Sequence, residues 1–69
     1  MFNKRKFKAV LLENGLTIDD VADILKISKV TVYRKMNGQS DFFLSEILKI
    51  SEMIGRKNVV DIFFAEQVS

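Results

Sequence analysis

Basic side chains that could bind phosphate or read a nucleobase are concentrated in two short stretches of the chain. Residues 26–38 contain Lys26, Lys29, Arg34 and Lys35 but no acid. Residues 1–8 also lack an acid and contain Lys4, Arg5, Lys6 and Lys8. All nine acids lie elsewhere, so a chain of formal net charge +2 would carry two positive patches. Such patches are typical of proteins that meet phosphate groups, although a basic N-terminus alone is weak evidence.

The segment SKVTVYRKMNG, residues 28–38, combines several groups that suit the major groove of DNA. The guanidinium of Arg34 can donate two hydrogen bonds to guanine, Lys29 can reach guanine or phosphate, and Val30 can touch a thymine methyl group. Ser28 is a good helix N-cap, and no acid follows it in the first turn. The positive end of that helix dipole is therefore free to face phosphate.

Catalysis and metal binding are poorly supported, because the chain contains no Cys and no His. Their absence removes disulfides, thiolate and imidazole ligands, cysteine nucleophiles and the usual general base. The remaining candidates are Asp19, Asp20 and Asp23, which we interpret as a solvated acidic helix face. We therefore expect no enzyme, no catalytic residue, no metal and no cofactor.

The length and composition indicate one all-α domain over residues 1–69, a compact bundle of five short helices. The chain has 69 residues, 48% of them apolar, and no Pro. We expect helices over 3–13, from 18 to 25 after a capping box at Thr17, from 29 after Ser28, over 44–54 and over about 58–66. Gly15, Gly38 and Gly55 are expected to end helices. No stretch is long and apolar enough for a membrane span or a signal peptide, so we expect a cytoplasmic protein.

The apolar periodicity predicts which helix faces are buried. The expected core positions are Phe7, Val10 and Leu11, then Val21, Ala22 and Leu25, then Val32 and Met36, and finally Leu44, Ile47, Leu48, Ser51 and Ile54. Lys29, Val30, Tyr33 and Arg34 are left on the outer surface of the third helix. Near the C-terminus, Val59, Val60, Ile62, Phe63 and Phe64 exceed what one helical stripe can bury. A subunit interface that uses Val60, Phe63 and Phe64 is the preferred explanation, and a more fully wrapped core is the alternative.

Residues 16–55, LTIDDVADILKISKVTVYRKMNGQSDFFLSEILKISEMIG, resemble the lambda-repressor-like, Cro-type helix-turn-helix family. The most specific matches are the opening LT-x-x-x-x-A-x-x-L, the turn I-S-x-x-T-V and the Asn-Gly pair that follows. This resemblance implies a five-helix fold, a transcriptional regulator of phages and bacteria, and a homodimer on double-stranded DNA. It assigns base reading to Lys29, Val30 and Arg34. It implies that Thr31 reaches a base or the backbone and that the loop with Asn37, Gln39 and Ser40 contacts phosphate. Thr17, Ser28, Tyr33 and Lys35 are also expected at the DNA backbone or next to it.

Three positions depart from the family pattern. Ile18 stands where members usually have a Gln that touches DNA, so that contact is expected to be lost. Lys26 stands where Gly usually forms the turn, which implies either backbone strain at Lys26 or a different turn. Asp41 lies near the loop that should meet phosphate and would be repelled unless it caps the fourth helix.

The leading expectation is a sequence-specific regulator that occupies an operator in phage or prophage DNA. The alternative is a small helical adaptor or anti-repressor that uses the same bundle to bind a protein. The acid-rich second helix and the apolar Ile18 favour the alternative. For Lys29, Arg34 and Lys35 the competing interpretation is an ordinary solvated helix face. Tyr33 is equally compatible with the DNA-facing surface and with packing against the bundle, and the N-terminal lysines fit a solubilising role.

Overall fold

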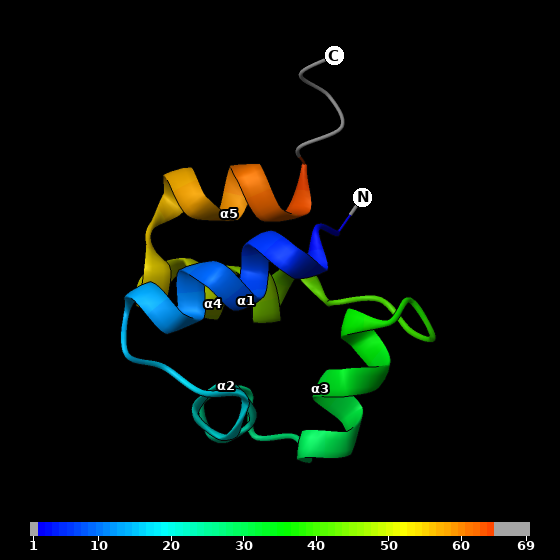
Figure 1. Ribbon diagram of the computed structural model, residues 1–69. Coiled ribbons are helices and arrows are strands. Elements are labelled where there is room, and N and C mark those ends of the chain that lie inside the picture. Colours follow the sequence, from blue (N-terminus) through cyan, green and yellow to red (C-terminus); the bar gives the residue numbers. More distant parts are fainter. Residues whose placement is uncertain (1, 65–69) are drawn as a thin grey trace.

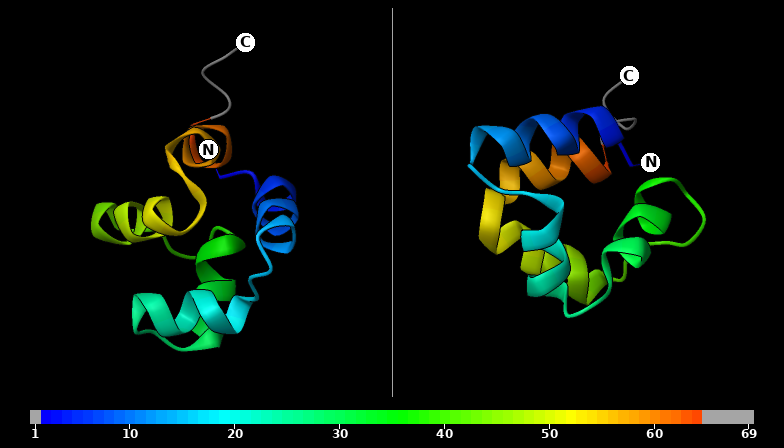
Figure 2. Two further views of the ribbon diagram at one scale, coloured as in Figure 1. Left: turned by 90° about the vertical axis from the view of Figure 1, so that its left-hand side faces the viewer. Right: turned by 60° about the horizontal axis from the view of Figure 1, so that its bottom comes forward.

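A computed structural model describes residues 2–64, which form an all-α bundle of five helices. The helices are α1 (Lys4–Glu13), α2 (Ile18–Leu25), α3 (Lys29–Met36), α4 (Leu44–Ile54) and α5 (Arg56–Phe63). α5 packs against α1 and α4 at one end of the molecule, while α2 and α3 lie toward the other end (Figures 1 and 2). The predicted fold class is confirmed. No helix in this part of the chain is long and apolar enough to cross a membrane.

Side-chain caps define where the first three helices begin. Asn3, Thr17 and Ser28 each accept a hydrogen bond from the backbone amide three residues later. Each cap satisfies an amide that the helix itself leaves without a partner. Gly15, Gly38 and Gly55 follow helices with φ of 68°, 83° and 93°, a region that is strained for other residues. The N-caps at Thr17 and Ser28 and the helix ends at the three glycines are therefore confirmed.

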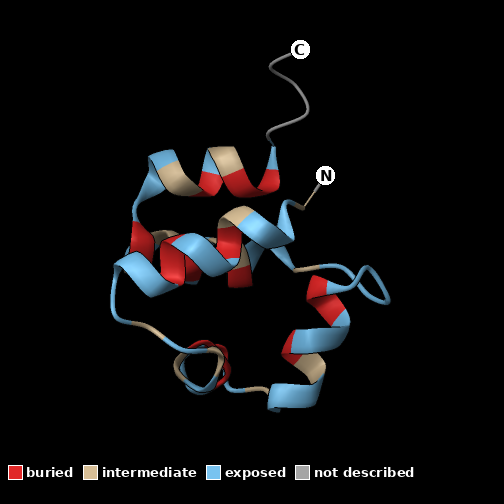
Figure 3. Ribbon diagram, viewed as in Figure 1, coloured by how far each residue is buried: buried red, intermediate tan, exposed pale blue. Residues whose placement is uncertain are grey.

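One continuous core joins all five helices. Its buried apolar residues are Phe7, Val10, Leu11, Val21, Ala22, Leu25, Val32, Met36, Ile50, Ile54, Val59, Ile62 and Phe63. Figure 3 shows that the buried side of α5 faces the rest of the bundle. The amide of Asn3 donates to the carbonyl of Ile62 at 2.7 Å, which ties the start of α1 to the end of α5.

The buried face of α4 differs from the predicted one. Ile50 is fully buried, whereas Leu44 and Leu48 are 70% and 57% exposed. The helix phase is set instead by Glu46, Ile50 and Ile54, which lie one turn apart and all point inward. The prediction that Leu44 and Leu48 belong to the core is therefore wrong.

The C-terminal apolar group is divided between the core and the surface. α5 begins at Arg56, two residues earlier than expected, and the predicted end near residue 66 lies outside the described residues. Val59, Ile62 and Phe63 are buried, while Val60 and Phe64 remain 44% and 43% exposed. The ring of Phe63 packs 5.2 Å from Phe2 and 5.3 Å from Phe42, measured between centroids. The assignment of Phe63 to a subunit interface is therefore wrong, because this aromatic cluster already covers it.

Candidate nucleic-acid interface

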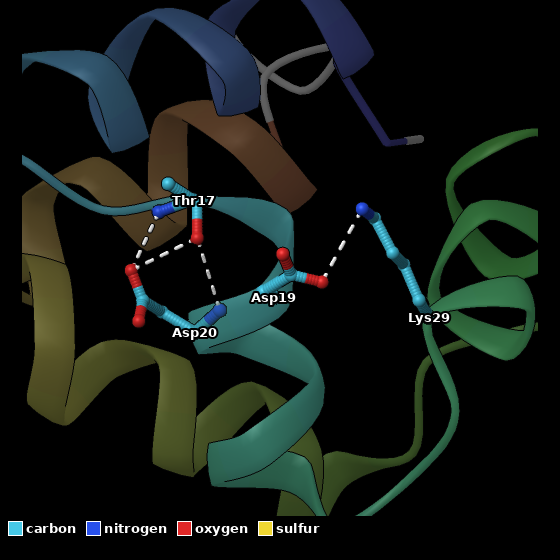
Figure 4. Close-up of polar contacts among 4 residues, drawn as sticks. All are labelled: Thr17, Asp19, Asp20 and Lys29. Carbon is cyan, nitrogen blue, oxygen red and sulfur yellow. Dashed lines mark hydrogen bonds and ion pairs between the residues drawn. The ribbon is translucent and has the colours of Figure 1, made fainter.

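The start of α2 is fixed by the predicted capping box. The backbone amide of Thr17 donates to Asp20 Oδ2 at 2.8 Å, and the amide of Asp20 donates to Thr17 Oγ1 at 3.2 Å (Figure 4). The two bonds satisfy two backbone amides and place Val21 and Ala22 against the core. Thr17 is exposed, but its hydroxyl is already engaged with Asp20.

The turn between α2 and α3 keeps its left-handed residue although no glycine is present. Lys26 adopts φ 59° and ψ 42°, and the amide of Ile27 donates to the carbonyl of Ala22 at 3.1 Å. The sequence implied either strain at Lys26 or a different turn, and the structure shows strain at Lys26. An L-residue in this region costs on the order of 1 kcal/mol. The half-buried side chain of Ile27 packs against the core and closes the turn.

Ser28 begins α3 and also restrains its first turn. Its Oγ accepts from the amide of Thr31 at 3.1 Å and lies 2.8 Å from Thr31 Oγ1. Val32 and Met36 are 0% and 4% exposed and hold the inner side of the helix against the bundle. α3 is thus anchored at its capped start and along its inner face.

The three predicted base-reading residues all lie on the exposed surface of α3. Val30 is 59% exposed and Tyr33 is 39% exposed, while Lys29 and Arg34 are also exposed. Among residues 2–64, Arg34 has no ion-pair partner, so its guanidinium is free to donate to an incoming group. α3 itself contains no acid. The outer face of α3 therefore combines hydrogen-bond donors with an apolar side chain, as direct readout of base pairs requires.

Lys29 forms an ion pair that the sequence did not predict. Its Nζ lies 3.3 Å from Oδ1 of Asp19, on the first turn of α2 (Figure 4). The two side chains are 52% and 68% exposed. The acidic start of α2 therefore reaches the candidate site, whereas the sequence suggested only a solvated face. Asp19 and Lys29 are ten residues apart and lie on different helices, so no helical spacing in the sequence predicts that they pair.

Lys35 was predicted to lie at the DNA backbone, and this prediction is wrong. The residue is 6% exposed. Its Nζ lies 3.0 Å from Glu46 Oε1, donates to the carbonyl of Asp41 at 2.9 Å and sits 4.1 Å from the centroid of the Phe43 ring. Lys35 falls on the inner side of α3 because it lies one turn from Val32 and next to Met36. Its ammonium links α3 to α4 and is not available to phosphate.

The loop after α3 lies beside the N-terminal basic stretch. Asn37, Gln39 and Ser40 are exposed, as a phosphate-contacting loop requires. Lys4 Nζ donates to Asn37 Oδ1 at 2.6 Å, so the start of α1 and this loop lie side by side. Figure 1 shows the start of α1 on the same side of the molecule as the loop that follows α3.

Two of the departures from the family pattern are also resolved. Ile18 is half-buried and packs against the core, so it offers no polar group to DNA. Asp41 does not cap α4, whose N-cap is Phe43. Instead, Glu46 Oε1 accepts from the backbone amide of Phe43 at 2.8 Å.

Comparison with known families supports the helix-turn-helix. Residues 9–39 match the family model of the helix-turn-helix domain of resolvase. No curated protein and no solved structure matches the chain. The matched family differs from the lambda-repressor-like family that the sequence resembles, and a DNA-binding helix-turn-helix is what the two have in common. The geometry and the match together support an all-α bundle with a helix-turn-helix.

Proposed function

We propose that the chain is a sequence-specific double-stranded DNA-binding transcriptional regulator of the operator-binding repressor type, at work in phage or prophage DNA within the bacterial cytoplasm. The observation that carries this proposal is the outer face of α3, where Lys29, Val30 and Arg34 are exposed while Val32 and Met36 fix the helix from below. The family match over residues 9–39 covers this face completely.

In this proposal the residues of the face have separate tasks. Arg34 donates to guanine, Lys29 donates to a guanine on a neighbouring pair, and Val30 packs on a thymine methyl group. Positioning on the phosphate backbone is assigned to neutral donors around them, namely Tyr33, Asn37, Gln39, Ser40 and the paired hydroxyls of Ser28 and Thr31. Thr17 lies beside this surface, but its hydroxyl and its amide both donate to Asp20. Lys4 adds a cation at the edge formed with Asn37, because the hydrogen bond between them holds its ammonium there.

A homodimer on DNA belongs to the same proposal. Val60 and Phe64 leave apolar surface exposed at the end of α5, and a two-fold interface there would cover it. Sedimentation of the chain with and without its DNA site tests this part, because a dimer doubles the mass bound per palindromic site. One chain per site under saturating conditions would contradict it.

The second candidate function is a protein-binding adaptor or anti-repressor. It is favoured by the exposed apolar side chains of Phe43, Leu44 and Leu48 near the start of α4. Apolar groups of this size at the surface are common where proteins meet. The pairing of Lys29 with Asp19 also lowers the net positive charge of the DNA-facing surface.

A salt series separates the two functions. Affinity for fragments of genomic DNA is measured by fluorescence anisotropy between about 50 and 200 mM salt, the range over which phosphate contacts are strongly salt-dependent. Lys4, the cation assigned to the backbone, predicts a slope of log affinity against log salt of about −0.9 or steeper. An adaptor predicts little DNA binding at any of these concentrations, and that result would overturn the proposal.

A further inference from the structure

Asp19 is an acid within the surface that the proposed function presents to DNA. The capping box at the start of α2 uses Thr17 and Asp20, so it does not need the Asp19 carboxylate. That carboxylate instead lies beside Lys29, with 3.3 Å between Oδ1 and Nζ (Figure 4). An aspartate on a phosphate-facing surface weakens binding to every DNA sequence, because it opposes the charge of the backbone.

Stability does not account for the pair. Both side chains are more than half exposed, and exposed ion pairs contribute little to folding. The main effect of the carboxylate is therefore on the binding of DNA to Lys29. While it is paired, the ammonium adds almost no net positive charge to the surface. Random DNA is held mainly by that net charge.

Base reading by Lys29 survives the pairing. An ammonium has three donors, so one can remain on Asp19 while another reaches O6 or N7 of a guanine. The pair therefore reduces the attraction to phosphate, which every DNA sequence offers. It keeps the hydrogen bond to guanine, which only the correct sequence offers. Specificity is the difference between these two affinities, so it rises even though total attraction falls.

We infer that Asp19 is a specificity-determining residue, which pairs with Lys29 and thereby suppresses binding to random DNA. This inference rests on the proposed function, because it requires that α3 face DNA. It assigns to the acidic start of α2 a task in discrimination between sequences.

The test is Asp19→Asn, assayed by anisotropy on the selected DNA site and on random duplex of the same length. In Asp19→Asn, Lys29 is free to contact one more phosphate, so the slope of log affinity against log salt becomes steeper by about 0.9. Between 1 M and 0.1 M salt, the affinity of the variant for random DNA should therefore rise about eightfold more than that of the unaltered chain. Affinity for the selected site is expected to rise less, so the ratio of the two affinities falls.

Two controls isolate the pair. Asp23→Asn removes the same charge from the same helix and should change random-DNA affinity less than Asp19→Asn does. In a Lys29→Met background, Asp19→Asn should change random-DNA affinity by less than about twofold, because Asp19 then has no Lys29 ammonium to pair with.

Equal effects of Asp19→Asn and Asp23→Asn, or the same effect with and without Lys29, would overturn the inference and leave the proposed function intact. Failure of the unaltered chain to bind DNA at low salt would overturn both. Circular dichroism of each variant checks that the fold is kept, and Asp20 retains the capping box in all of them.

Discussion

The buried ion pair between Lys35 and Glu46 leads to a specific prediction about stability. Their side chains are 5% and 10% exposed, and Nζ and Oε1 are 3.0 Å apart. Lys35→Met keeps most of the side-chain volume but leaves the carboxylate of Glu46 buried with only the amide of Phe43 as a partner. Breaking one side of such a pair costs about 3–5 kcal/mol. A chain of this size has a free energy of unfolding of only about 3–10 kcal/mol, so the variant should lose at least about a third of its stability.

Urea denaturation followed by circular dichroism at 25 °C measures this effect. The second variant adds Glu46→Gln to Lys35→Met, which removes the stranded charge and leaves an acceptor for the Phe43 amide. Replacement of both charges is often close to neutral, so most of the lost stability should return. Lys29→Met is the matched control, because its ion pair with Asp19 is exposed and should be worth under about 1 kcal/mol.

Similar losses of the free energy of unfolding in Lys35→Met and Lys29→Met would contradict the buried pair. A double variant no more stable than Lys35→Met would contradict it as well. Either result would mean that Lys35 is solvated rather than part of the junction between α3 and α4.

Two further predictions concern backbone strain and the core. Lys26→Gly should raise the free energy of unfolding by about 0.5–1 kcal/mol because it removes the left-handed strain. Lys8→Gly, inside α1, should instead lower it by about 1 kcal/mol, and the same sign for both in urea denaturation would contradict the assigned turn. Ile50→Ala should cost about 2–5 kcal/mol because Ile50 is fully buried. Leu48→Ala should cost under about 0.5 kcal/mol, and the reverse order would contradict the observed phase of α4.

Local chemistry made the helix starts predictable from the sequence. Thr17 with Asp20, and Ser28 before an apolar-periodic stretch, satisfy amides within three residues of themselves. No distant part of the chain is needed to decide such contacts. The outer face of α3 was predictable for the same reason, because Val32 and Met36 determine its phase.

Positions that depend on distant partners could not be predicted. The helix phase places Lys35 on the inner side of α3, but a lysine is expected in solvent unless its buried partner is known, and that partner, Glu46, is eleven residues away. In α4, leucine and isoleucine occur on nearly all sides, so the periodicity did not show that Ile50 rather than Leu48 is buried. Phe63 is covered by Phe2 and Phe42, which come from other parts of the chain.

The central claim is that the outer face of α3 reads DNA sequence, and Arg34 tests it most directly. A binding site is first selected from a random DNA pool, and affinity is then measured for that site and for its single-base-pair variants. Arg34→Ala should lose about 1–3 kcal/mol on the selected site and lose discrimination at one base pair. Arg56→Ala, at the start of α5, removes an equally charged exposed residue and should leave the preference unchanged. If Arg34→Ala retains the full preference at every base pair, the account is contradicted.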